Sequence, residues 1–335
     1  AYETWGTLSP QRDNVVLIAH ALTGSSHVAP HFPGDAPGWW DPMVGPGCPI
    51  DTARYFVICP NMLGSCYGST GPRSIDPQTG HRYNLRFPYI TVRDIVATQA
   101  RLLDYLGIER LHAVLGGSLG GMQALEWAAM FPQRVERVIP IAVGGRFSDQ
   151  GIAYNEVQRR AIMLDPAWKN GEYEDGEGPA TGLAIARMLG VITYQSDELM
   201  TARFNRREEA RYTAWPEFLC RYDVEGYLHY QGEKLVRRFD ANSYLYLTRA
   251  MDSHDLGRGR GSYEAGLARI RARTLAIGIR SDILFWPAQV RDLVERLRRL
   301  GKEAEYWELD SPNGHDAFLK DFAQIGPVIR EFLDR

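Results

Sequence analysis

The sequence of 335 residues contains only four cysteines, and no two of them form a Cys-x-x-Cys pair. This spacing offers neither the thiol pair of a redox site nor the ligand pattern of a structural zinc site. Scattered thiols suit a reducing compartment, so we expect a cytoplasmic protein with no bound metal. The four are Cys48, Cys59, Cys66 and Cys220.

The sequence also lacks long apolar runs and an excess of charge of one sign. No stretch approaches the roughly 20 apolar residues that cross a bilayer, so we expect no membrane span. The formal net charge of -3 gives no electrostatic reason to bind nucleic acid or an anionic membrane. Because the first residue is Ala1 rather than methionine, an earlier targeting segment stays an open alternative.

Short apolar runs rich in β-branched residues alternate with helical stretches in the first half of the chain and again near its end. Continuous apolar strands separated by helices predict a mostly parallel sheet covered on both faces. The expected strands are Val15–Ala19, Tyr55–Cys59, Leu111–Leu115, Val138–Val143, Thr274–Ile279 and Ala304–Leu309. The expected helices are Thr91–Leu106, Met122–Met130, Pro287–Leu300 and Ala317–Leu333.

The alternation stops between residues 148 and 266, where the pattern is helical and no strand is clear. We therefore predict an α/β core formed by residues 1–147 and 267–335, with a helical lid, residues 148–266, inserted between its two parts. Such a lid would lie over the carboxyl ends of the strands, where an open α/β sheet binds its ligand. The expected lid helices are Val157–Leu164, Gly182–Gly190, Glu198–Thr213, Pro216–Arg238 and Ala241–Met251.

The run from Leu111 to Gly121, LHAVLGGSLGG, carries the most chemical information. It places Gly-x-Ser-x-Gly between an expected strand and an expected helix, which is the form of a nucleophile elbow. Such a turn lifts the hydroxyl of Ser118 out of the chain and directs the N–H groups of the following helix at it. A purely structural turn of small residues is the alternative interpretation.

A serine hydroxyl needs a base, and the base needs an orienting acid. In proteins with this elbow the acid and then the histidine follow the serine along the chain. Asp282 directly follows the expected strand Thr274–Ile279, and His315 follows the next strand. Both residues therefore come at the carboxyl ends of successive strands. Asp310, on the same loop as the histidine, competes with Asp282.

Acyl chemistry also needs N–H donors for the developing oxyanion. The backbone amide of Leu119, next after the serine, is one candidate. The second normally comes from the loop after an earlier strand, and here that loop is His20–Gly24. We predict the amide of Leu22 as this donor, with an ordinary turn as the alternative.

These segments together resemble the homoserine O-acetyltransferase family of the α/β-hydrolase superfamily, and the resemblance covers nearly the whole chain. The fold that it implies is an α/β-hydrolase fold with a helical lid. The segments that carry it are Tyr2–Leu8, His20–Gly24, Asn61–Pro72, Gly116–Gly121, Leu183–Gly190, Ala250–Asp252 and Gly314–Leu319.

The resemblance implies roles for further residues. Arg187, in the lid, would hold the α-carboxylate of an amino acid, and Asp316 would hold its α-ammonium group. Tyr194 would add a hydrogen bond, although core packing is an alternative for it. Ser118 would carry the acyl group, with His315 as base.

The resemblance further implies acetyl-CoA as co-substrate, L-homoserine as acceptor, no bound cofactor, and a homodimer formed through the lid helices. The product, O-acetylhomoserine, is an activated intermediate for methionine synthesis. Succinyl-CoA as donor and serine as acceptor stay open, because related enzymes use either donor and one methylene is weakly discriminated. An esterase or thioesterase, or a non-catalytic binding module on the same fold, are the remaining alternatives.

Overall fold

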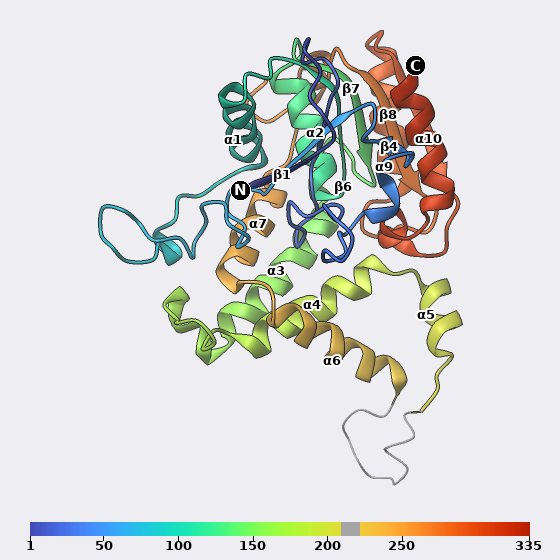
Figure 1. Cartoon of the computed structure of the whole chain (residues 1–335). Helices are drawn as coiled ribbons and strands as arrows, with labels where there is room; N and C mark the ends of the chain where they lie inside the picture. The colour runs from blue at the N-terminus through green and yellow to red at the C-terminus, as the bar shows by residue number, and fades with distance from the viewer. Residues whose placement is uncertain (209–221) are drawn as a thin grey trace.

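The computed structural model describes residues 1–208 and 222–335, and its centre is a seven-stranded sheet (Figure 1). The strand order is β1-β5-β2-β6-β7-β8-β9, and every neighbouring pair is parallel except β1 with β5. The predicted α/β-hydrolase class is confirmed. The strands are β1 (Tyr2–Trp5), β2 (Val15–Ile18), β5 (Phe56–Pro60), β6 (Leu111–Gly117), β7 (Val135–Ile141), β8 (Arg273–Ile279) and β9 (Ala304–Leu309).

Both faces of the sheet are buried, which explains why its central strands read as unbroken apolar runs. Successive side chains of a strand point to opposite faces. In β2, Val15 and Leu17 pack into one apolar core, whereas Val16 and Ile18 pack into the other. The flanking helices are α1 (Val92–Tyr105), α2 (Leu119–Met130), α9 (Pro287–Arg299) and α10 (Phe322–Asp334).

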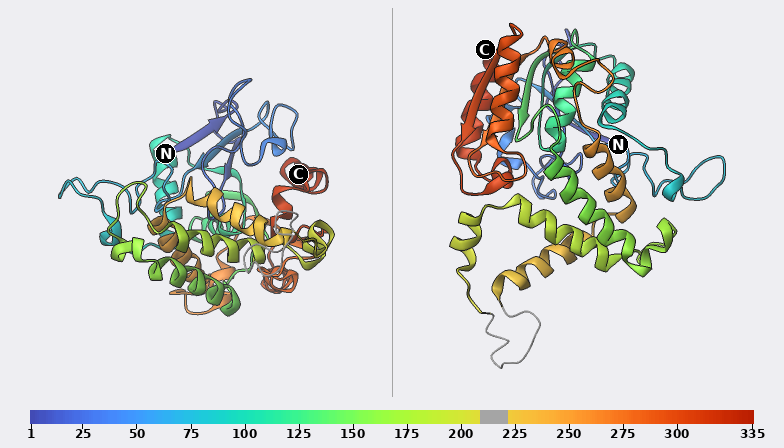
Figure 2. Two further views of the ribbon diagram at one scale, coloured as in Figure 1. Left: turned by 90° about the horizontal axis from the view of Figure 1, so that it is seen from below. Right: turned by 180° about the vertical axis from the view of Figure 1, so that it is seen from behind.

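Within the described residues, five longer helices lie between β7 and β8, and Figures 1 and 2 show α4, α5 and α6 as a separate layer beside the sheet. The helix predicted for 198–213 ends earlier, because Asn205 takes a left-handed conformation with φ of 43°. The remainder of that prediction, and the start of the one at 216–238, lie outside the described residues. The five are α3 (Asp149–Leu164), α4 (Ala180–Tyr194), α5 (Asp197–Phe204), α6 (Asp223–Val236) and α7 (Ala241–Asp252); a short helix, α8 (Tyr263–Ala268), follows them.

Two elements differ from what the sequence predicted. β1, the antiparallel edge strand, was not predicted; it has only four residues and its first side chain, Tyr2, is exposed. The single helix expected at 317–333 was wrong, because a 3₁₀ turn (Gly314–Leu319) precedes the separate helix α10. In the described part of the chain no helix is both long and apolar enough to span a bilayer.

Candidate active site

Ser118 lies in the sharp turn between β6 and α2. Its φ of 59° and ψ of -125° are strained for a residue with a side chain, and such strain costs about 1–3 kcal/mol. The glycines on either side allow close packing: a Cβ atom on Gly116 or Gly120 would lie 2.4 or 2.0 Å from the carbonyl oxygen of Ala19. The motif therefore forms the elbow that the sequence predicted, pressed against the end of β2.

Asp282 and His315 meet although 33 positions separate them. His315 Nδ1 lies 2.7 Å from Asp282 Oδ2, and both side chains are buried. Asp282 Oδ1 accepts hydrogen bonds from the amides of Leu284 (2.8 Å) and Phe285 (2.9 Å), which fix the carboxylate. Since a carboxylate only accepts, His315 carries its hydrogen on Nδ1 and leaves Nε2 free to act as a base.

Asp310, the competing acid, is placed differently. Its carboxylate is largely exposed and forms an ion pair with Arg280 at 2.6 Å. The geometry thus favours Asp282 as the partner of the histidine.

The histidine loop reaches the elbow through an aromatic side chain. A Cβ atom on Gly117, the residue before Ser118, would lie 2.4 Å from the Phe318 ring. That ring meets the imidazole of His315 edge to face, with centroids 5.8 Å apart. His315 Nε2 is buried and has no hydrogen-bond partner among the described residues; it forms no hydrogen bond with Ser118 Oγ. Such contacts often tighten only when substrate is bound.

The charges around His315 favour its protonated form. Burial opposes a charge on the ring, but the charge and hydrogen bond of Asp282, together with the charge of Asp316, outweigh it. The pKa of His315 is therefore raised above its ordinary value. A base whose pKa is raised accepts a proton from a hydroxyl more readily.

The two predicted oxyanion donors lie on segments in contact. Leu119 is the first residue of α2, and Leu22 lies in the loop after β2 whose beginning packs on Gly116 and Gly120. Among the described residues, neither amide donates a hydrogen bond within the protein. The lid also contacts this loop, because Arg238 donates to the backbone oxygen of Thr23 at 2.7 Å.

His20, which the sequence did not single out, fastens the same loop. The amide of Met62 donates to His20 Nε2 at 3.1 Å, so Nδ1 carries the hydrogen and donates to the oxygen of Ala21 at 2.9 Å. Burial lowers the pKa of His20 to about 4, which keeps the ring neutral. The sequence pointed to the segment His20–Gly24, but only the folded structure shows the hydrogen bond between His20 and the amide of Met62.

The three residues expected to bind an amino acid lie around the histidine. The ring of Tyr194 is 5.9 Å from that of His315, and the guanidinium of Arg187 lies 5.6 Å from the Tyr194 ring. Burial raises the pKa of Tyr194, the charge of Arg187 lowers it, and that of Asp316 raises it. The Asp316 carboxylate also lies 3.5 Å from Lys320 Nζ. A cation and an anion thus lie near the partly buried tyrosine beside the base.

Tyr244 is a further residue that sequence reasoning missed. It is fully buried on α7, and its hydroxyl donates a hydrogen bond to Gln158. Nothing in the local sequence marks it, because its position depends on how α7 packs against α3.

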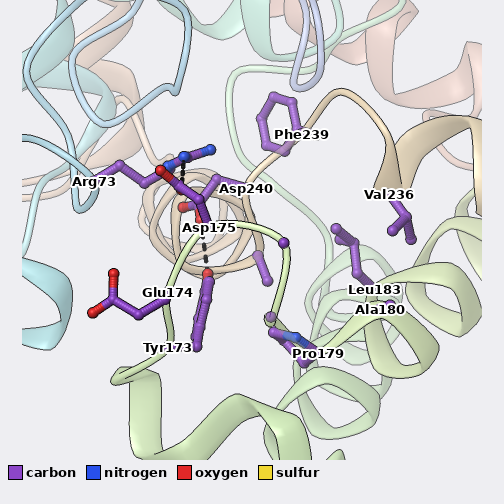
Figure 3. A pocket seen from close by; sticks show the side chains of 13 residues that line it. Arg73, Tyr173, Glu174, Asp175, Pro179, Ala180, Leu183, Val236, Phe239 and Asp240 are labelled. Atoms are coloured by element: carbon purple, nitrogen blue, oxygen red, sulfur yellow. Dashed lines mark hydrogen bonds and ion pairs between the residues drawn. The ribbon is translucent and has the colours of Figure 1, made fainter.

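A pocket of about 130 Å³ lies where lid and core meet (Figure 3). In it Arg73 forms an ion pair with Asp175, and the Tyr173 hydroxyl donates to Asp240 at 2.7 Å. None of the predicted site residues lines this pocket, so we assign it no part in the chemistry.

Comparison with known proteins gives four findings. Residues 14–322 match the family described as the alpha/beta hydrolase fold. A homoserine O-acetyltransferase of Symbiobacterium thermophilum is 60% identical, over 99% of this chain and 88% of that protein. The crystal structure of homoserine O-acetyltransferase from Bacillus anthracis is similar with a TM-score of 0.95 at 34% identity, covering 100% of this chain and 91% of that one. Esterase E22 is also similar, with a TM-score of 0.91 at 34% identity over 99% and 93% of the two chains.

Proposed function

This chain belongs to the homoserine O-acetyltransferase family of α/β hydrolases, and we propose that it transfers the acetyl group of acetyl-CoA to the hydroxyl of L-homoserine. The activity is an acyl transfer, and its product is an activated intermediate for methionine synthesis. One observation carries the proposal: Tyr194 lies beside the His315 of the His315–Asp282 pair, and the charges of a cation, Arg187, and an anion, Asp316, act on that tyrosine.

In the first half-reaction Ser118 Oγ attacks the thioester carbonyl carbon while its proton passes to His315 Nε2. The amides of Leu22 and Leu119 hold the oxyanion of the tetrahedral intermediate. The carbon–sulfur bond then breaks, and the thiol of coenzyme A leaves with the proton from His315. An acetyl ester on Ser118 remains.

In the second half-reaction the hydroxyl of homoserine gives its proton to His315 and attacks the acetyl ester. The ester bond to Ser118 breaks, and the serine oxygen recovers the proton. Arg187 pairs with the α-carboxylate and Asp316 with the α-ammonium group, with Tyr194 between them. Two opposite charges at a fixed separation select a free amino acid and orient its hydroxyl toward the acyl group.

Hydrolysis is the second candidate function, because esterase E22 shares the fold and 34% of the sequence. Both reactions use the same acyl-serine and differ only in whether water or an amino acid accepts the acyl group. We expect transfer to dominate, since Arg187 and Asp316 would bind an amino-acid acceptor and would have no role if water were the acceptor.

The experiment offers the purified protein acetyl-CoA or succinyl-CoA, each with homoserine, serine or no amino acid, and follows thiol release and product mass together. We expect O-acetylhomoserine as the main product and slow thiol release without an amino acid. Equal thiol release with and without homoserine, with acetate as the only product, would replace the proposal by hydrolysis.

We also propose a cytoplasmic homodimer formed through the lid helices. Large apolar side chains are exposed two turns apart on α3, at Val157 and Leu164, and on α4, at Ile185 and Ile192. Residues seven positions apart lie on nearly the same face of a helix, so each helix presents an apolar stripe to solvent. Such stripes suit a second copy of the chain.

A further inference from the structure

Three side chains with metal-ligand chemistry converge outside the site described above. Glu3 lies in β1, and His27 and His31 lie in the loop after His20–Gly24. Glu3 Oε2 is 2.8 Å from His27 Nδ1 and 2.8 Å from His31 Nε2. His27 and His31 lie in a proline-containing loop rather than on one helix face, so the sequence alone does not mark them as a metal-binding pair. The fold adds the third group from a distant strand.

The hydrogen-bond partners of His27 leave a place for a cation. His27 Nε2 lies 2.7 Å from the carbonyl oxygen of Ala36, which can only accept, so Nε2 carries a hydrogen. A neutral imidazole has a single N–H, and Nδ1 would then turn a lone pair toward the carboxylate of Glu3. Either a second proton or a metal ion must lie between them.

The surroundings of the cluster match those of a metal site. A metal-bound histidine usually donates its other N–H to a carbonyl or carboxylate, as Nε2 of His27 does. The Ser26 hydroxyl donates to Glu3 Oε1 at 2.9 Å, which leaves Oε2 for the histidines. Trp5 stacks on the His31 ring with centroids 4.9 Å apart and fixes its plane.

The spacing is close to what a small divalent ion needs. The three candidate ligand atoms all lie within 4.8 Å of one another. Tetrahedral Zn²⁺ with N and O ligands at about 2.0–2.1 Å holds neighbouring ligand atoms about 3.3 Å apart. The two contacts of 2.8 Å would widen by about half an ångström, which partly exposed side chains allow by small rotations. Water would complete the coordination.

We propose that Glu3, His27 and His31 bind a divalent transition metal, with Zn²⁺ the best match to two imidazoles and one carboxylate. The ion would tie β1 to the loop that carries both histidines. That loop continues to Trp40, whose Nε1 donates to the backbone oxygen of Phe318 at 2.9 Å. Phe318 in turn contacts His315. The metal would thus stabilise the loop that packs against Phe318, and it would take no part in acyl transfer.

The test uses the full chain, stripped with EDTA and titrated with ZnCl₂ by calorimetry, with Co²⁺ absorption as a report on the ligand geometry. We expect one strong site per chain and a rise in melting temperature with Zn²⁺. His31→Asn and, separately, Glu3→Gln should weaken this binding at least about tenfold. His81→Asn, which changes an exposed histidine outside the cluster, should leave it unchanged.

Because His31 is partly exposed, its replacement leaves the apolar core intact, and Glu3→Gln keeps the shape of the second ligand. Equal Zn²⁺ affinity in the wild type and in both cluster variants would overturn the proposal. Absence of strong binding in the wild type would overturn it as well, and the second proton would then be the cation between His27 and Glu3.

Discussion

A single hydrogen bond decides which nitrogen of His315 can act as a base. Replacing Asp282 by Asn puts an amide N–H in place of a carboxylate oxygen and favours the tautomer with its hydrogen on Nε2. We predict that Asp282→Asn lowers kcat by about 10⁴-fold, as the loss of the orienting acid does in other triads. The measurement is thiol release from acetyl-CoA under single-turnover conditions.

The matched control is Asp310→Asn, since Asp310 lies on the histidine loop but pairs with Arg280 at the surface. This variant should retain nearly full activity. If Asp310→Asn lowered the activity more than Asp282→Asn did, the assignment of Asp282 as the acid would be wrong.

Arg187 is predicted to act on the amino acid alone. Arg187→Ala should raise the KM for homoserine by about 10–100-fold, because a hydrogen-bonded charge pair contributes about 1.5–3 kcal/mol. Formation of acetyl-Ser118, followed by mass spectrometry without homoserine, should stay nearly unchanged. The control is Arg160→Ala, which removes an exposed arginine of α3. Equal damage to both half-reactions would argue against a role in acceptor binding.

At the scale of elements, the loop after β2 is held by the neutral ring of His20. Folding lowers the pKa of His20 from 6.5 to about 4, so the unfolded chain binds this proton more tightly. Stability from this group is therefore present above pH 6.5 and is lost as the pH falls toward 4. At 1.36 kcal/mol per pKa unit, the loss amounts to about 3 kcal/mol.

We predict that His20→Gln removes this part of the acid sensitivity, while lowering stability at neutral pH through the lost bond to Met62. The measurement is the free energy of unfolding in urea, determined for wild type and variant from pH 6.5 to about 4. The difference between the two proteins should change across this range. Burial also lowers the pKa values of His112 and His254, but both proteins share those contributions. Parallel stability curves for the two proteins would contradict the prediction.

The elements that the sequence predicted well are those whose burial is uniform. Strands such as β2 and β6 are apolar on both faces, and periodicity alone identifies them. The break before α10 could not be seen in this way. There Asp321 accepts hydrogen bonds from Ser311 and Asn313, which fold the histidine loop back on itself and interrupt the helical pattern. These partners lie eight and ten positions away, beyond the reach of local propensity.

In the candidate site, too, some residues could be selected from the sequence and others depend on distant contacts. Ser118, Asp282 and His315 could be selected from chain order, because the carboxyl ends of parallel strands meet at one edge of the sheet. His20, Tyr244 and Phe318 could not, since each acts through a contact between segments far apart in sequence. Only the packing of the loops and the lid makes those contacts.

At the scale of the whole molecule, the lid presents apolar stripes that a monomer leaves in water. Ile185 and Ile192 on α4 are each close to half exposed, and Val157 and Leu164 on α3 are more so. If two chains meet through these helices, a charge placed in the stripe would be buried without a partner, which costs several kcal/mol. We predict that Ile185→Asp combined with Ile192→Asp converts the dimer to monomers, as measured by light scattering coupled to size-exclusion chromatography.

The matched control is Tyr105→Asp, which places the same charge at the end of α1 on a side chain that is 84% exposed and outside the lid. It should leave the mass of the wild type unchanged. Because the base, the acid and the nucleophile all come from one chain, the monomeric variant should still form acetyl-Ser118. A wild-type mass of one chain would contradict the homodimer. A dimer that survives both lid substitutions would place the association on another surface.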